Sequence, residues 1–144
     1  MLQTASLPHR IKEFYERVSV ERGAALVDLP NLYGERVHFI NPVVDQHGLA
    51  AFREAWEKAL RKYKVFLFHD IEVIGTDEQF TLTYSMTIAF GFGPSFTTDM
   101  ATSCRATDGK VVFCRDYFDP LGSLVQPLGP VRWFYRKLFS LLVA

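Results

Sequence analysis

The sequence predicts an α+β domain, in which a cone-shaped, curved antiparallel β-sheet wraps around N-terminal helices. Up to residue 63, apolar residues recur mostly at helical spacing. From residue 65 onward, apolar and polar residues alternate over about four long strands joined by short turns. The 144 residues are enough for one sizeable core, so we expect a single domain, 1–144, with its helices on one face of the sheet.

The composition excludes some classes of function. Sixteen basic and sixteen acidic residues cancel, which leaves no basic surplus for nucleic acid. No apolar run is long enough to span a membrane, and the start of the chain is amphipathic rather than a signal peptide, so we expect a cytoplasmic protein. Two cysteines are too few for a disulfide framework or a four-cysteine zinc site, and no metal or cofactor is expected. Thirteen Phe residues indicate a large core, an apolar cavity or an interface.

The helical part has recognisable boundaries. From Leu7 the apolar spacing predicts a first helix, which Ser6 can cap, and residues 24–32 predict a short second one. Residues 35–42 read as a short strand that Pro42 ends. A long helix then follows Gly48, and its apolar stripe comprises Leu49, Phe52, Trp56, Ala59, Leu60 and Tyr63.

Strands are expected at 65–74, 80–90, 95–106 and from 110 to about 118. Asp108 and Gly109 predict a two-residue type I′ turn between the last two. Residues whose numbers sum to about 217 would then face each other, which places Ala101 opposite Asp116. Asp99 and Asp116 would be diagonal neighbours on the same face of the sheet. The same register sends Cys104 and Cys114 to opposite faces, so both should be free thiols.

Two segments resemble a known group of proteins. The segment INPVVDQHGLAAFREAWEKAL (40–60) resembles the strand–Pro–Gly–helix passage of SnoaL-like and ketosteroid-isomerase-like proteins. The segment DGKVVFCRDYFDPLGSL (108–124) resembles their last hairpin, and RDYFD within it is closest to limonene epoxide hydrolases. The resemblance covers roughly residues 6–125 and implies the nuclear-transport-factor-two-like fold. It also implies an interior pocket and, in many members, a homodimer formed through the convex face of the sheet.

The resemblance also implies which face of the last strand is inward. Both faces are half apolar, so composition alone leaves open whether Asp116 is solvated or lies at the bottom of an apolar pocket. The match of Asp116 to a pocket acid of the epoxide hydrolases implies that it points inward. The candidate acid/base residues are Asp116, Asp99 and His69, and the candidate substrate-binding residues are Tyr15, Asn41, Trp56, Tyr84, Met86 and Phe118.

Each candidate has a structural alternative. His69 could be a core histidine bonded to the backbone, and Tyr84 an amphipathic core residue. Asn41 could be a turn former before Pro42, and Asp99 a solvated residue at a strand end. His38 and His47 fall into no pattern.

The family chemistries fit the sequence unequally. Steroid isomerisation is disfavoured, because the base position corresponds to Asn41 and the oxyanion acid to Ala101. Epoxide hydrolysis needs a second carboxylate, for which only a displaced Asp99 is at hand. A polyketide-cyclase type of reaction needs only an acid/base in an apolar cavity, which Asp116 with His69 could supply.

Residues 126–144 form a helical extension beyond the resemblance. Their apolar and basic residues predict an amphipathic helix that caps the barrel mouth or packs on a dimer partner, with contact to a membrane surface as the alternative. For the whole chain we expect a pocket protein for a small apolar molecule, acting as an isomerase, cyclase or hydrolase. The alternative is a non-catalytic ligand-binding or dimerisation module.

Overall fold

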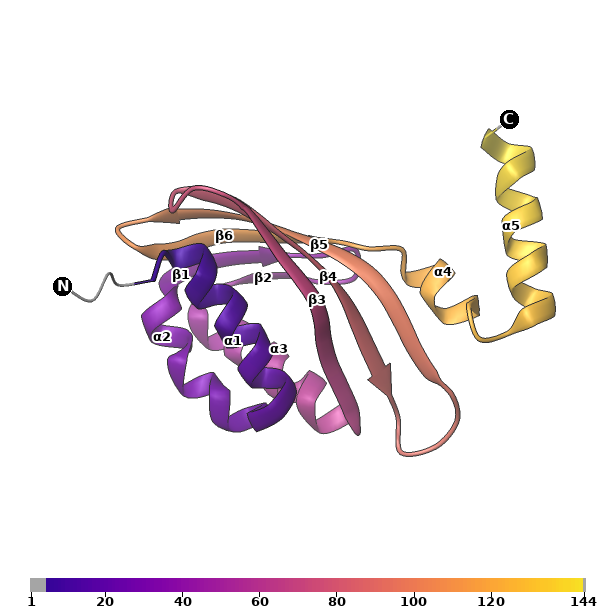
Figure 1. Cartoon of the computed structure of the whole chain (residues 1–144), viewed down its shortest axis with the longest axis horizontal. Coiled ribbons are helices and arrows are strands. Elements are labelled where there is room, and N and C mark those ends of the chain that lie inside the picture. Colours follow the sequence, from indigo (N-terminus) through magenta and orange to yellow (C-terminus); the bar gives the residue numbers. More distant parts are fainter. Residues whose placement is uncertain (1–4, 144) are drawn as a thin grey trace.

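Six strands form one curved, unclosed sheet in the computed structural model, which describes residues 5–143 (Figure 1). Their order across the sheet is β2-β1-β6-β5-β4-β3. Four of the neighbouring pairs are antiparallel, and β1 runs parallel to β6. The strands are β1 Tyr33–Ile40, β2 Asp45–His47, β3 Val65–Gly75, β4 Gln79–Ala89, β5 Ser95–Thr107 and β6 Lys110–Tyr117. The predicted α+β fold is confirmed, although β2 and the parallel pair were not foreseen.

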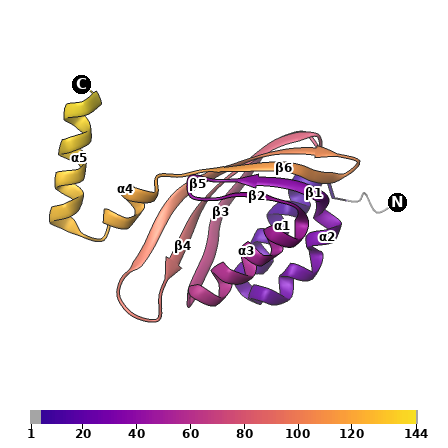
Figure 2. The same ribbon diagram turned by 180° about the vertical axis from the view of Figure 1, so that it is seen from behind.

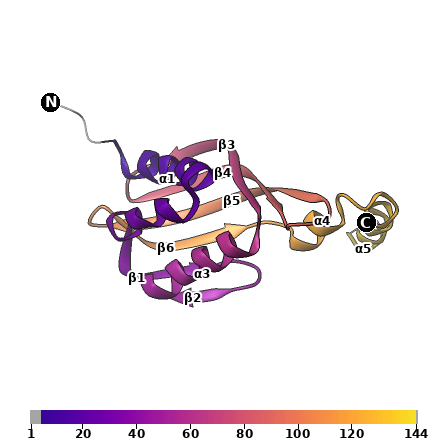
Figure 3. The same cartoon turned by 90° about the horizontal axis from the view of Figure 1, so that it is seen from below.

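Three N-terminal helices cover one face of this sheet (Figure 3). They are α1 Leu7–Glu21, α2 Leu29–Leu32 and α3 Leu49–Lys62, and a 3₁₀ segment, Arg22–Asp28, precedes α2. The segment 24–32 was predicted as one helix and is instead a 3₁₀ segment followed by a single α-turn. The apolar stripe of α1 is buried against the sheet. This concave face of the sheet is therefore the side on which the core lies.

The hairpin between β5 and β6 differs from its predicted register. The two-residue turn is confirmed, with positive φ at Asp108 and Gly109 and Thr107 paired with Lys110. Beyond it, β6 has one extra residue, Val112, opposite the step from Arg105 to Ala106. Such a bulge shifts all later pairs by one residue. Paired residue numbers then sum to 218, and Asp116 faces Thr102 instead of Ala101.

The bulge also reverses the prediction about the cysteines. Cys104 lies directly opposite Cys114, and both are buried on the concave side, so the expectation that they occupy opposite faces is wrong. They are nevertheless free thiols. Burial raises the pKa of both thiols well above its ordinary value, which keeps them protonated and unreactive.

A second bulge lies in β3. His69 pairs with Ser85 and Glu72 with Thr83, so β3 has one residue more than β4 between these pairs, and Asp70 there has a φ of 55°. His69 is exposed, because the buried residues before the bulge are Phe66 and Phe68 and the first one after it is Ile71. The expectation that His69 is a pocket acid/base or a core histidine is therefore wrong.

The C-terminal helix α5 stands away from the sheet (Figure 2). This helix, Gly129–Val143, follows the short helix α4 Pro120–Val125, which contacts β5 through the hydrogen bond of Ser123 to Thr98. Asp119 caps α4 by accepting a hydrogen bond from the backbone N–H of Gly122, and it also accepts one from the Tyr135 hydroxyl of α5. None of the described α5 residues is buried, so of the two expected roles this helix does not cap the barrel mouth, and packing on a dimer partner stays a prediction. No helix within residues 5–143 is both long and apolar enough to cross a membrane.

Candidate functional site

A chain of three hydrogen-bonding side chains crosses the concave face of the sheet. Thr102 of β5 donates its hydroxyl hydrogen to Oδ1 of Asp116 on β6, at 2.6 Å. The hydroxyls of Thr102 and of Tyr84 on β4 are 2.8 Å apart. Since Thr102 has one hydrogen and gives it to the carboxylate, Tyr84 must donate to Thr102. The bonds therefore run in one direction, from Tyr84 through Thr102 to Asp116.

The surroundings of Asp116 destabilise its charged form. Burial raises the pKa of Asp116 to about 6, although the hydrogen bond from Thr102 acts in the opposite direction. Within residues 5–143, no Lys, Arg or His forms an ion pair with this carboxylate. Asp116 is thus an inward carboxylate that titrates close to neutral pH and is not neutralised by a cation.

Aromatic side chains from the helices cover this hydrogen-bonded chain. The ring of Tyr15 on α1 lies 5.3 Å from the ring of Tyr84 and 5.8 Å from that of Trp56 on α3, measured between centroids. Burial raises the pKa of both tyrosines well above its ordinary value, so their hydroxyls stay protonated and can donate. The Nε1 of Trp56 is buried and finds no hydrogen-bond partner in the described part of the chain.

The other predicted binding residues lie in different places. Met86 and Phe118 are partly buried and pack against the core on the concave side. Asn41, in contrast, closes the turn between β1 and β2, where its Oδ1 accepts hydrogen bonds from the backbone N–H groups of Val43 and Val44, both at 2.9 Å. Asn41 is therefore the turn former that the sequence left open as an alternative.

Two predicted partners of Asp116 lie on the convex face. Asp99 is exposed and accepts a hydrogen bond from Ser85, at 2.7 Å, so the prediction that it shares a face with Asp116 is wrong. His69 is bonded to Thr87 and to the adjacent Asp70 on that same convex face. Both errors follow from the bulges, since a shift of one residue moves a side chain to the other side of a sheet.

Sequence reasoning missed Thr102, the only polar or charged residue within 5–143 that is fully buried, with 1% of its surface exposed, whereas Asp116 is half-buried. Its signal was present in the alternation of Met100, Thr102 and Cys104, which places one hydroxyl among apolar groups on one side of β5. Only the bulge in β6 brings this hydroxyl opposite Asp116.

Buried aromatic and aliphatic side chains pack between the sheet and the helices. Three hollows, of about 270, 200 and 450 Å³, are found at α4–α5, between α1 and α2, and on the convex face. None of these three is lined by Asp116. Asp116 is half-buried, and the partly buried side chains of Met86 and Phe118 lie on the same side of the sheet.

Comparison with solved structures shows the fold. A candidate polyketide cyclase from Pseudomonas putida has a TM-score of 0.70 and 18% identity, covering 85% of this chain and 98% of that one. An NTF2-like protein from Burkholderia xenovorans has a TM-score of 0.68 and 18% sequence identity, and the match covers 88% of this chain and 98% of that one. The third structure is a protein with a ketosteroid isomerase-like fold from Catenulispora acidiphila, in complex with trimethylamine. It has a TM-score of 0.71 and 13% sequence identity, and the match covers 85% of this chain and 93% of that one.

Comparison of sequences identifies the family. No curated protein matches the chain. The family described as SnoaL-like domain matches residues 11–114. This range holds α2, α3 and the five strands β1 to β5 completely, most of α1, and the first part of β6. Since this match spans well over half of the sequence, the chain belongs to the SnoaL-like domain family.

Proposed function

We propose that the protein binds a small, largely apolar carbonyl compound against the concave face and that Asp116 transfers a proton to and from it. The observation that carries this proposal is the inward carboxylate of Asp116, which has no cationic partner and a pKa raised to about 6 by burial. The reaction class is that of a cyclase or isomerase. It is in keeping with the name of the candidate polyketide cyclase from Pseudomonas putida.

Asp116 suits both halves of a proton transfer. At pH 7 a carboxyl group with a pKa of about 6 is mostly ionised, so it can accept a proton from a carbon next to a carbonyl. It is also a stronger base than an ordinary Asp, and once protonated it can return the proton to another atom. Thr102 holds one carboxylate oxygen through its hydrogen bond, which leaves the other oxygen for the substrate.

The aromatic residues would hold the substrate. Tyr15, Trp56 and Tyr84 form an apolar wall, and Met86 and Phe118 border the same side of the sheet. The unpartnered Nε1–H of Trp56 could donate to the carbonyl oxygen of a ligand and thereby satisfy a buried donor. The same bond would strengthen as negative charge develops on that oxygen.

Hydrolysis by two carboxylates finds no support in the geometry. Asp99 and His69 lie on the convex face, so neither can act with Asp116 on one substrate molecule. The proposal therefore rests on a single acid/base residue.

A non-catalytic binding module is the second candidate function. It is favoured by the dense filling of the interior and by the absence of Asp116 from the three hollows described above. In such a module, the bond between Thr102 and Asp116 would serve the structure alone.

Proton transfer can be tested without knowing the natural substrate. We expect the protein to accelerate the exchange of α-protons of an apolar cyclic β-keto ester in D₂O, as measured by proton NMR. Asp116→Asn should lower this exchange by at least about a hundredfold, the lower range for a general base. Asp99→Asn is the matched control and should leave it unchanged. Equal exchange by both variants would exclude Asp116 as the base.

Thermal unfolding separates the two candidate functions. The pKa of Asp116 in the folded state, about 6, exceeds its ordinary value of 3.8, so folding favours the protonated form. Wild-type stability should fall as the pH rises from about 4 to 6, by up to about 3 kcal/mol. Asp116→Asn lacks this loss, and its Tm at pH 7.5 should equal or exceed that of the wild type. The difference in Tm between Asp116→Asn and the wild type should vanish near pH 4. A lower Tm at pH 7.5 would instead indicate a structural role.

A cytoplasmic location and a homodimer remain predictions. We propose that a second copy covers the convex face, where Leu67 and Tyr117 have 41% and 52% of their surfaces exposed. Sedimentation equilibrium at micromolar concentration should give a dimer. Leu67→Glu should convert it to a monomer, whereas Val20→Glu, on the exposed side of α1, should not. A monomeric wild type would contradict this proposal.

A further inference from the structure

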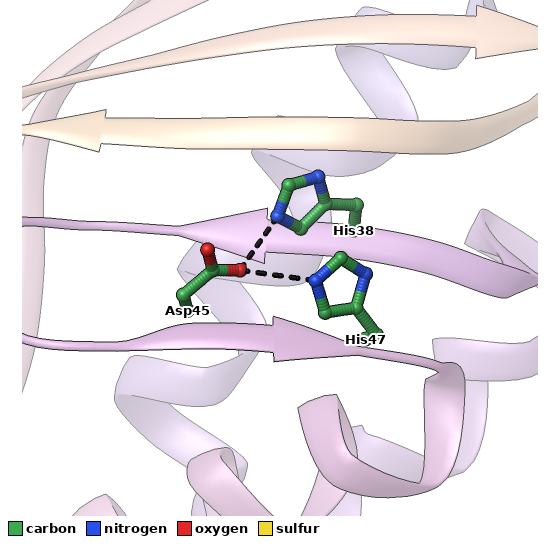
Figure 4. Close-up of side chains that lie close together, drawn as sticks. All are labelled: His38, Asp45 and His47. Atoms are coloured by element: carbon green, nitrogen blue, oxygen red, sulfur yellow. Dashed lines mark hydrogen bonds and ion pairs between the residues drawn. The ribbon is translucent and has the colours of Figure 1, made fainter.

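Three potential metal ligands converge at the edge of the sheet (Figure 4). His38 of β1 and His47 of β2 are direct cross-strand partners. Asp45 pairs with Ile40, two residues further along, and therefore projects from the same face. The hairpin thus brings two imidazoles and one carboxylate together.

The ligand atoms lie at distances that suit one small ion. The Oδ1 of Asp45 is 2.6 Å from Nε2 of His38 and 3.3 Å from Nε2 of His47. In a tetrahedral zinc site with bonds of about 2.0–2.1 Å, neighbouring ligand atoms stand about 3.3 Å apart. One pair already has this separation. The pair of Asp45 with His38 is a hydrogen bond, which would open by less than 1 Å when a cation replaces the shared proton. The ligand nitrogens of the two imidazoles lie within 4.8 Å of each other.

The surroundings hold the histidines in place but leave them accessible. The two imidazole rings stack at 4.1 Å between centroids and 14° between planes. His38 also packs edge-on against Phe113 of β6, at 5.3 Å. The turn closed by Asn41 fixes the start of β2. His38 is partly exposed, and Asp45 and His47 are exposed, so a cation could enter from solvent and keep water as a fourth ligand.

We propose that His38, Asp45 and His47 form a binding site for a divalent transition metal, with Zn²⁺ as its type ligand. Two imidazoles and one carboxylate are a ligand set typical of zinc, whereas Mg²⁺ and Ca²⁺ prefer oxygen ligands alone. The site lies on the other side of the sheet from Asp116 and does not depend on the function proposed for that residue. Binding would join β1 to the short edge strand β2.

The chain contains a matched control for this site. His69 is also exposed on the convex face and also contacts an aspartate, Asp70, at 3.2 Å, but it has no second imidazole beside it. His69→Gln therefore removes an imidazole–carboxylate pair without touching the proposed site. Cys104 and Cys114 are buried and hold their protons, so they do not compete for zinc in the folded protein.

The experiment is a titration of the folded protein with ZnCl₂ alone at pH 7.5, followed by calorimetry and by the NMR signals of the histidine rings. We expect one zinc per chain, broadened or shifted signals of His38 and His47, and a Tm that rises with zinc and falls back with EDTA. His47→Gln and Asp45→Asn should each weaken binding by at least about tenfold. His69→Gln should bind as the wild type does.

Two outcomes would overturn the proposal. One is the absence of saturable binding to the wild type at millimolar zinc. The other is that His47→Gln and His69→Gln both lose the same amount of zinc affinity, or that neither loses any. Either result would mean that no particular pair of histidines holds the ion. Both histidines are exposed, so neither variant is expected to unfold, and the Tm without zinc verifies this.

Discussion

The bulge at Val112 determines which side chains of the β5–β6 hairpin face the helices. It places Thr102 opposite Asp116 and Cys104 opposite Cys114, and it leaves Asp99 on the convex face. Without this extra residue, the pairing set by the turn would put Ala101 opposite Asp116, and the carboxylate would lose its hydrogen-bond donor. The local chemistry of the concave face thus depends on one extra residue, Val112, whose side chain is exposed.

Packing and electrostatics at this site have the same origin. The aromatic side chains that fill the space between sheet and helices remove water from Asp116, Tyr15 and Tyr84 alike. Removal of water raises the pKa of each group and so keeps the phenols neutral, while the carboxylate titrates near neutral pH. The charged form of Asp116 destabilises the fold, which is the pattern expected of a group kept for its chemistry rather than for stability.

The elements of the fold could be predicted because each has a strong local signal. The spacing of apolar residues correctly predicted the helices α1 and α3. The residues Asp108 and Gly109 correctly predicted the turn between β5 and β6. The short strand β2 has only three residues, too few to show any periodicity, and so the pairing of His38 with His47 was not foreseen.

The site could be predicted only in part, because bulges leave little trace in sequence. In β3, apolar residues occupy consecutive positions from Val65 to Phe68, so alternation does not tell which of them face inward. This is why His69 was placed on the wrong side. The inward direction of Asp116 was inferred from a resemblance, since the two faces of β6 have similar composition. Tyr84 was placed correctly because β4 alternates without interruption.

The central claim is that Asp116 is a desolvated carboxyl group held by one hydrogen bond. Its pKa can be measured directly from the ¹³C chemical shift of its side-chain carboxyl group as a function of pH. The account predicts a midpoint of about 6 in the wild type. It also predicts a higher midpoint in Thr102→Val, because that variant lacks the bond that stabilises the charged form. A wild-type midpoint at or below about 4, the value of an ordinary Asp, would contradict it.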